Sequence, residues 1–358
     1  MRRYVEKKRH ELDLLCRAGV GLTHIAPAVC RLVRDMVGAE ACALFWLDAQ
    51  GQPEGFFHEH SPVAAQELFL NEFERLFIGP AEINITTLAQ TPGARIGRLL
   101  NVPTSYYRYN TFNLLVRASG HVHTLDLRVD VQGRARAVLM LFRAREQPFH
   151  DQDAALLGRI EPYLHRALTG TPEASVWSAP ASRSGHLLLA EGGRRLLMFA
   201  GDAEALLKAC TLVGQDVRVS GPMQAVPRFV RDLCVRLHAS GQPQAHQHID
   251  IPTGRLSMVA HRLQQAPPQA ASDQTLVALE LLHPPRLQVV QRVLALGLSP
   301  LQREIALLAG VGGLRPDCER VIGVSNEALK KHLKTIYRAA GVAGWDGLAA
   351  TLQTGGDG

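Results

Sequence analysis

The stretch that decides the fold of the C-terminal region is residues 298–348, LSPLQREIALLAGVGGLRPDCERVIGVSNEALKKHLKTIYRAAGVAGWDGL. Ser325 has the short hydroxyl side chain that is favoured at the N-cap of a helix. An apolar stripe follows at steps of three and four residues, formed by Leu329, Leu333, Ile336 and Ala340. Because this spacing places the four side chains on one helix face, the sequence predicts a helix anchored in a core.

The opposite face of this predicted helix is largely basic. Lys331, Lys334 and Arg338 share the helical spacing of Glu327, offset by two residues from the apolar stripe, and Lys330 lies on the flank. Lys and Arg on an exposed helix face neutralise phosphates or reach base edges in the major groove of DNA. A solvated amphipathic helix explains the same pattern without a ligand, so the spacing leaves both interpretations open.

Short motifs within 298–348 resemble the LuxR-type helix-turn-helix family without a gap. They are Leu298-Ser299-Pro300, Arg303-Glu304, Gly323-Val324-Ser325, Leu329-Lys330-Lys331-His332-Leu333, Ile336-Tyr337 and Gly341-Val342. The resemblance implies an all-α domain that binds double-stranded DNA. The DNA-binding residues that it and the basic face suggest are Ser325, Asn326, Glu327, Lys330, Lys331, Lys334 and Arg338.

Several residues depart from the family pattern. Leu314 stands where a capping Ser is usual, Pro316 opens the short scaffold helix, and Ala328 occupies a position often held by Thr. Glu319 replaces a small residue near the turn, where a carboxylate risks desolvation. From Leu296 to the end, seven Lys or Arg face six Asp or Glu, a net charge of +1. We therefore expect weak phosphate attraction for a lone domain, and dimerisation or a partner protein to assist it.

Composition sets limits on the whole chain. Its 358 residues, 46% hydrophobic and 20% charged, are enough for two or three globular cores. No apolar run approaches the roughly 20 residues that cross a bilayer, and no signal-like stretch follows the charged start, so we expect a cytoplasmic protein without membrane attachment. A net charge of +6 and a pI near 9.1 are compatible with an anionic partner, but are mild.

Residues 1–169 show the element order of a sensor domain. Helical spacing over 6–37 breaks at Gly19 and Gly21, and an apolar run at 41–47, a turn, and residues 54–60 predict two strands. A helix over 63–78, a hairpin around Gln132-Gly133 and a helix over 151–168 follow. This order resembles a GAF domain, which implies helices packed against one sheet and a sensor or dimerisation role.

The remaining chain divides at composition changes. Residues 170–185 are rich in Pro, Ser, Ala and Gly, as in a linker. Residues 186–283 have two strands, then helices, then three strands, an order that resembles a PAS domain. A connecting helix spans 284–296, and 297–358 hold the helix-turn-helix. The connecting helix either transmits the sensor state or a dimer contact, or simply packs on its neighbouring domain. The predicted fold class is multi-domain α+β, with two antiparallel-sheet sensor-like domains before an all-α domain.

Other patterns in the sequence give weaker evidence for a metal or ligand site. His121 and His123, and likewise His246 and His248, alternate along strands. A simple hairpin register around Pro252-Thr253-Gly254 puts His261 on the other face from the second pair, which argues against a metal site. The six scattered cysteines have no CxxC pair and are expected to be buried hydrophobes. A cluster of aromatic residues is compatible with a ligand pocket or with a packed domain edge: Tyr106, Tyr107, Tyr109 and Phe112.

The sequence thus favours a transcriptional regulator that acts as a homodimer on a pseudo-palindromic site, with its sensor regions controlling DNA binding. The alternative is an interaction protein whose helix-turn-helix no longer binds DNA alone and which modulates another regulator. No catalytic motif, cofactor site or phosphate-binding loop appears in the sequence, so an enzyme ranks below both. A small-molecule ligand in a sensor region and a protein partner are compatible with either interpretation.

Overall fold

A computed structural model describes residues 2–79, 82–91, 95–97, 102–144, 146–170, 177, 183–223, 225–252, 254–264 and 273–354. The chain forms two compact units. The helical unit combines Met1–Gly21 and Gly170–Ser178 with His283–Gly358, and the two-sheet unit combines Leu22–Thr169 with Ala179–Leu282. Most of the predicted linker, 170–185, lies outside the described residues.

The first sheet of the two-sheet unit is antiparallel, in the order β2-β1-β5-β4-β3. Its strands are β1 Ala41–Leu47, β2 Pro53–Glu59, β3 Ile96–Gly97, β4 His121–Val131 and β5 Arg134–Ala144. The predicted hairpin is the β4–β5 pair, whose turn has positive φ at Gln132 and Gly133. Strand β1, which lies between β2 and β5, is buried along its whole length because helices cover both faces of the sheet.

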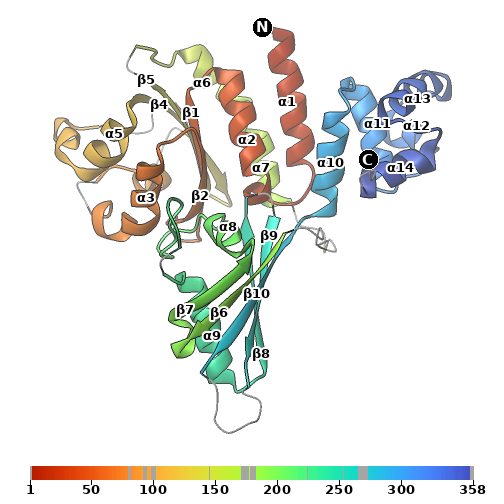
Figure 1. Ribbon diagram of the computed structural model, residues 1–358. Coiled ribbons are helices and arrows are strands. Elements are labelled where there is room, and N and C mark those ends of the chain that lie inside the picture. Colours follow the sequence, from red (N-terminus) through yellow and green to blue (C-terminus); the bar gives the residue numbers. More distant parts are fainter. Residues whose placement is uncertain are drawn as a thin grey trace. The chain divides into compact units, whose positions relative to one another are not determined.

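Two groups of helices cover this sheet (Figure 1). The group on one face is α2 Leu22–Val37, α6 Asp151–Gly158 and α7 Glu161–Thr169. The group on the other face is α3 Val63–Leu76, α4 Ile85–Gln90, the 3₁₀ helix η1 Thr104–Arg108, the π-helix η2 Thr111–Val116 and α5 Arg117–Ser119. Alternation along β1 therefore sends Cys42 and Leu44 toward α2, and Ala43 and Phe45 toward α3.

The second sheet has the order β7-β6-β10-β9-β8 and is also antiparallel. Its strands are β6 Ser184–Ala190, β7 Arg195–Gly201, β8 Gln244–Ile251, β9 Gly254–Arg262 and β10 Thr275–Leu282. The short η3 Glu191–Gly193 joins β6 to β7, and α8 Ala203–Lys208 and α9 Arg228–Ser240 supply side chains to the core on one sheet face. The predicted order of two strands, helices and three strands is confirmed.

The predicted register of the β8–β9 hairpin was wrong by one residue. Gly254 is the first residue of β9 and pairs with Ile251, so it does not belong to the turn. The shift places His261 opposite Gln244, on the same face as His246 and His248. The face argument against a three-histidine site therefore fails, although no group of three metal-binding side chains occurs within the described residues.

The helical unit contains α1 Arg2–Cys16, α10 Pro285–Ala295, α11 Pro300–Gly310, α12 Asp317–Ile322, α13 Asn326–Ala340 and α14 Trp345–Thr354. The first sensor domain predicted from the sequence, residues 1–169, includes α1, whereas in the structure α1 packs against α10. Two ion pairs also join α1 and its end to α11. Arg303 donates to Glu11 at 3.2 Å, and Arg17 pairs with Glu304.

The predicted helix spanning 284–296 corresponds to α10. Its Val289 and Val293 belong to the same hydrophobic core as α11, α13 and α14. Helix α10 therefore packs on the other helices of its unit. All six cysteines are buried and unbridged, as expected. Within the described ranges, no helix combines the length and the apolar character that crossing a membrane requires.

Candidate nucleic-acid interface and apolar pocket

Helix α13 is anchored by its apolar stripe. Leu329, Leu333 and Ile336 are buried, between 0% and 4% exposed, in the core shared with α11 and α14. Ala340, the fourth member, is half-buried and packs against the same core. The predicted helix and its buried face are confirmed.

The start of α13 follows a tight turn. Gly323 ends α12 in the left-handed conformation, with φ of 75°, which glycine adopts at little cost. Val324 is buried in the core, and the Ser325 hydroxyl accepts a hydrogen bond from the backbone N–H of Ala328 at 3.4 Å. Ser325 is thus the N-cap that the sequence predicted.

The outward face of α13 is accessible. All seven predicted DNA-binding residues are exposed: Ser325, Asn326, Glu327, Lys330, Lys331, Lys334 and Arg338. The helix carries four Lys or Arg side chains against one carboxylate, and none of the four cations pairs with a described carboxylate. The cationic groups are therefore available to an anionic partner.

Helix α12 corrects one expectation from the sequence. Glu319 is exposed, so its carboxylate is not desolvated, and the neighbouring Cys318 provides the buried side chain instead. Leu314 supplies no side-chain cap to α12, but its backbone N–H donates a hydrogen bond to the Asp317 carboxylate at 3.1 Å. A second bond from Arg320, at 2.8 Å, is the main cause that lowers the pKa of Asp317.

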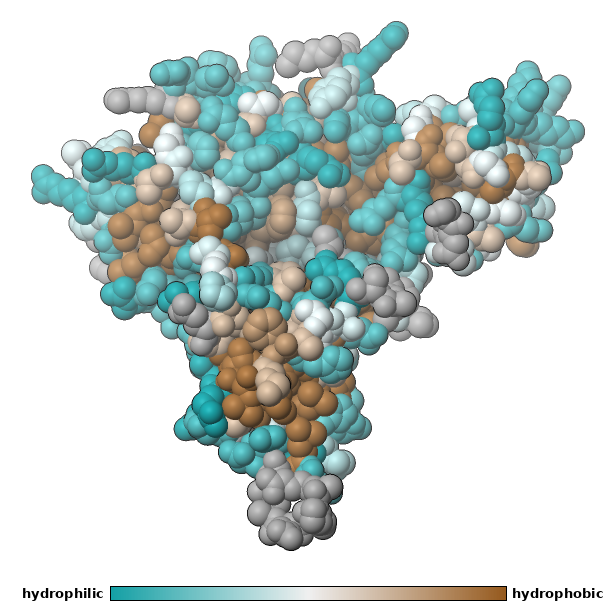
Figure 2. All heavy atoms as spheres, in the orientation of Figure 1, coloured by the Kyte–Doolittle hydropathy of each residue, from teal (hydrophilic) through white to brown (hydrophobic). Residues whose placement is uncertain are grey.

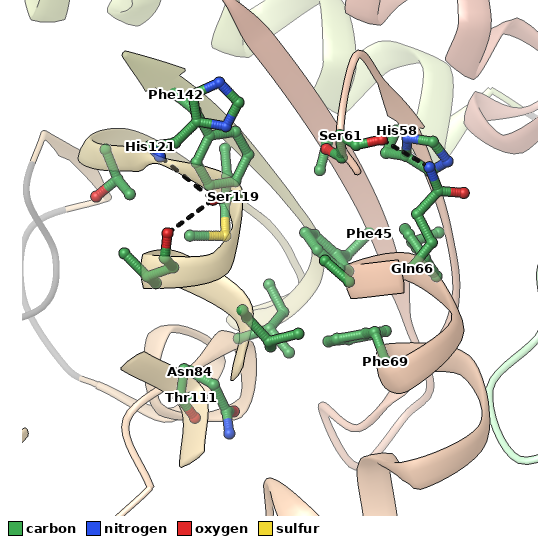
Figure 3. A pocket seen from close by; sticks show the side chains of 18 of the residues that line it. Phe45, His58, Ser61, Gln66, Phe69, Asn84, Thr111, Ser119, His121 and Phe142 are labelled. Atoms are coloured by element: carbon green, nitrogen blue, oxygen red, sulfur yellow. Dashed lines mark hydrogen bonds between the residues drawn. The ribbon is translucent and has the colours of Figure 1, made fainter. Parts of the chain in front are cut away.

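The two-sheet unit contains an apolar pocket between the first sheet and the group of helices that includes α3. Its floor comes from β1, β2, β4 and β5, and its other walls come from α3, the start of α4, and the η1–η2–α5 segment (Figure 3). The cavity volume is about 140 Å³. One wall is a π-helix, η2, a rare conformation that occurs frequently at functional sites.

Three phenylalanines form one wall of the pocket. Phe45 stacks on Phe56 with ring centroids 5.4 Å apart, and Phe69 of α3 lies 5.2 Å from the first and 5.0 Å from the second. The pairing register explains the meeting, since Phe45 lies directly opposite Phe56 in the sheet. The three side chains come from three separate elements, so no local motif in the sequence indicated them.

Polar side chains lie at two edges of the pocket (Figure 3). At one edge, the Gln66 amide donates to the Ser61 carbonyl at 2.8 Å and its side chain contacts His58. Burial lowers the pKa of His58 to about 4, against a small opposing effect of the Gln66 hydrogen bond. At the other edge, the Ser119 hydroxyl accepts from the backbone N–H of His121.

The predicted aromatic cluster is partly a pocket wall and partly a packed domain edge. Tyr106 is 8% exposed and lines the pocket, and its burial raises its pKa to about 12. Phe112 packs edge-on against Tyr106, with centroids 5.5 Å apart, but neither Phe112 nor Tyr109 lines the cavity. Tyr107 is 54% exposed. One of the four residues therefore belongs to the pocket, and the others form an adjoining edge.

The first histidine pair is not a simple alternating pair. The register of β4 against β5 shifts between His121 and His123. His121 lines the pocket and lies 3.7 Å from Glu40, whereas His123 is not part of the lining. The bulge thus separates two residues that the sequence pattern grouped together.

Comparisons with known proteins give little guidance. No family model matches the chain, and no curated protein matches it. Among solved structures, the chain is similar to the sensor region of a sensor histidine kinase, with 13% identity, a TM-score of 0.19, and coverage of 72% of this chain and 90% of that one. A likeness this distant carries no argument about fold or function.

Proposed function

We propose that this protein is a transcriptional regulator that binds double-stranded DNA through α13. The observation that carries the proposal is that this helix has two different faces. Its apolar stripe is fixed in the core, and four cations that pair with no described carboxylate lie on its exposed surface. A helix held in this way presents a rigid surface of suitable charge to a major groove. The resemblance of 298–348 to LuxR-type domains supports the same function.

The proposed contacts divide into two kinds. Ser325, Asn326 and Glu327 lie in the first turn of α13, where side chains of a recognition helix reach base edges. Lys331, Lys334 and Arg338 follow along the helix and would contact phosphates, which supply affinity rather than sequence preference. Mutation of the first group should therefore change which sequence is bound, and mutation of the second should weaken binding to every sequence.

We propose that the protein acts as a homodimer, with the two-sheet unit as its regulatory part. Strand β7 lies at the edge of the second sheet and exposes Met198 and Phe199, at 67% and 48%. Figure 2 shows hydrophobic side chains gathered over the β6–β7 side of this sheet. An exposed apolar edge strand is a ready surface for pairing with another chain.

A Met198→Lys variant places a charge on this edge and should be monomeric by light scattering. An unchanged dimer would exclude β7 as the dimer interface.

A second candidate function is a helix-turn-helix protein that pairs with another regulator and does not bind DNA alone. Three exposed apolar side chains near α12 favour it: Leu314, Val321 and Val311, at 67%, 59% and 45%. Such a surface is typical of protein contacts more than of phosphate contacts.

One experiment decides between the two functions. Purified protein is incubated with fragmented genomic DNA, and recovered fragments are then titrated at two salt concentrations. Recovery of a palindromic motif, with affinity that falls steeply as salt rises, supports the DNA-binding regulator. Failure of the folded protein to enrich any sequence would overturn that proposal and favour the interaction protein.

A further inference from the structure

The apolar pocket beside the first sheet plays no part in the proposed DNA binding. One small residue, Ala43, leaves space in the middle of its floor. In the floor of the pocket, Ala43 pairs with His58 on β2 and with Met140 on β5, and the next residue on the same face of β1 is Phe45. Large side chains therefore surround a position where only a methyl group projects.

The lining determines what the pocket can hold. Aromatic and aliphatic side chains dominate it, and no Asp, Glu, Lys or Arg is among the described lining residues. Several of its polar groups already have partners in the protein. Asn84 caps α4 and donates to the Phe77 carbonyl, and the Thr111 hydroxyl donates to Glu82 at 2.7 Å. A charged ligand would lose its hydration in this pocket without an ion pair to Asp, Glu, Lys or Arg in return.

The size of the pocket sets a second limit. Its volume of about 140 Å³ is close to that of an engineered apolar cavity of about 150 Å³ that binds benzene. The three phenylalanines present ring faces and edges, which favour an aromatic guest in a stacked or edge-on arrangement.

We propose that this pocket is a binding site for a small, neutral, hydrophobic molecule of about the size of one aromatic ring. The proposal does not depend on DNA binding, because it concerns direct binding to the two-sheet unit. Ala43 determines its capacity, since a larger side chain there would occupy the space that the ligand needs.

The test uses full-length protein and four probes of similar size. Toluene and phenol are neutral, whereas benzoate and benzylammonium carry opposite charges. Calorimetric titration should show that both neutral probes bind, and that both charged probes bind at least about tenfold more weakly. Absence of binding by both neutral probes, or equal binding of neutral and charged probes, would overturn the proposal.

Two matched variants locate the site. Ala43→Leu should abolish neutral-probe binding while the melting temperature stays equal or rises, because the leucine fills a void. Ala137→Leu makes the same change at a buried alanine of β5 that pairs with Trp46 on the opposite sheet face. It should lower the melting temperature by overpacking but leave the probe affinity of the folded protein unchanged. Unchanged affinity in a folded Ala43→Leu protein would place the ligand elsewhere and contradict the proposal.

Discussion

At the scale of single residues, the first sheet depends on one position that lacks a side chain. Gly55 pairs with Trp46, and a Cβ built on Gly55 would lie 2.7 Å from three atoms of the indole ring. The tryptophan side chain therefore packs directly on the backbone of β2. Because the clash involves a buried ring in a packed sheet, it cannot be relieved by moving a flexible chain end.

Gly55→Ala should lower the free energy of unfolding by about 1–3 kcal/mol, the usual cost of overpacking a core. Gly344→Ala is the control, because a Cβ there meets nothing within 4 Å and its φ is not in the left-handed region. Urea unfolding of both variants measures the difference. Equal stability of the two variants would show that the Trp46 ring moves aside without cost.

The low pKa of His58 predicts a pH dependence of stability. In the unfolded chain His58 has a pKa near 6.5, whereas burial in the fold lowers it to about 4. As pH falls below 6.5, the unfolded state binds a proton that the folded state excludes, so stability decreases until the folded pKa is reached. The loss attributable to this residue is on the order of 3 kcal/mol.

The control for this effect is His58→Gln, which removes the titrating group. Urea unfolding between pH 4 and 6.5 should show a shallower loss of stability in the variant than in the wild type. Part of the slope should remain, because burial also lowers the pKa of His24. Parallel curves for the two proteins would mean that His58 titrates normally in the fold.

At the scale of elements, Ser325 at the start of α13 affects both the stability of the helix and the proposed DNA binding, and two substitutions there separate these effects. Ser325 accepts the Ala328 N–H at the helix start and is also exposed on the proposed DNA-binding face. Ser325→Ala should cost about 1 kcal/mol of stability through loss of the cap. Ser325→Asp should keep the cap but weaken DNA binding, because it adds a negative charge beside the phosphates. Thermal unfolding and DNA titration of both variants check the two effects independently.

How far the sequence predicts each element depends on the range of the interactions involved. The stripe of α13 follows from a local period, so the sequence alone predicts Leu329, Leu333 and Ile336 as core residues, which the structure confirms. The β8–β9 register was missed because either a two-residue or a three-residue turn fits Pro252-Thr253-Gly254. Of the aromatic residues that the sequence suggests for a ligand pocket, only Tyr106 lines it. The other walls come together through strand pairing and helix packing, which leave no local pattern in the sequence.

At the scale of the whole molecule, the grouping of α1 with the C-terminal helices is the main departure from the sequence-based organisation. No periodic pattern signals it, because ion pairs between residues nearly 300 positions apart leave no local trace. Arg303 is 1% exposed and relies on Glu11, while Arg17 pairs with Glu304 at the next position of α11. These contacts predict that α1 contributes to the stability of the helical unit.

A double-mutant cycle measures this contribution. Arg17→Glu and Glu304→Arg should each destabilise the protein, and the exchanged pair should recover part of the loss. Both side chains are about one-third exposed, so solvent screening limits the coupling to about 0.5–1 kcal/mol. Additive effects of the two single variants would show that α1 is not coupled to α11 through this pair.

The central claim, that α13 grips DNA through its cationic face, is tested most directly by the salt dependence of DNA affinity in a Lys331→Ala, Lys334→Ala protein. Loss of two phosphate contacts should weaken binding and reduce the slope of log affinity against log salt by about 2. The control, Arg228→Ala, removes an exposed positive charge from α9 and should leave the slope unchanged. A slope identical to that of the wild type in the folded double variant would contradict the account.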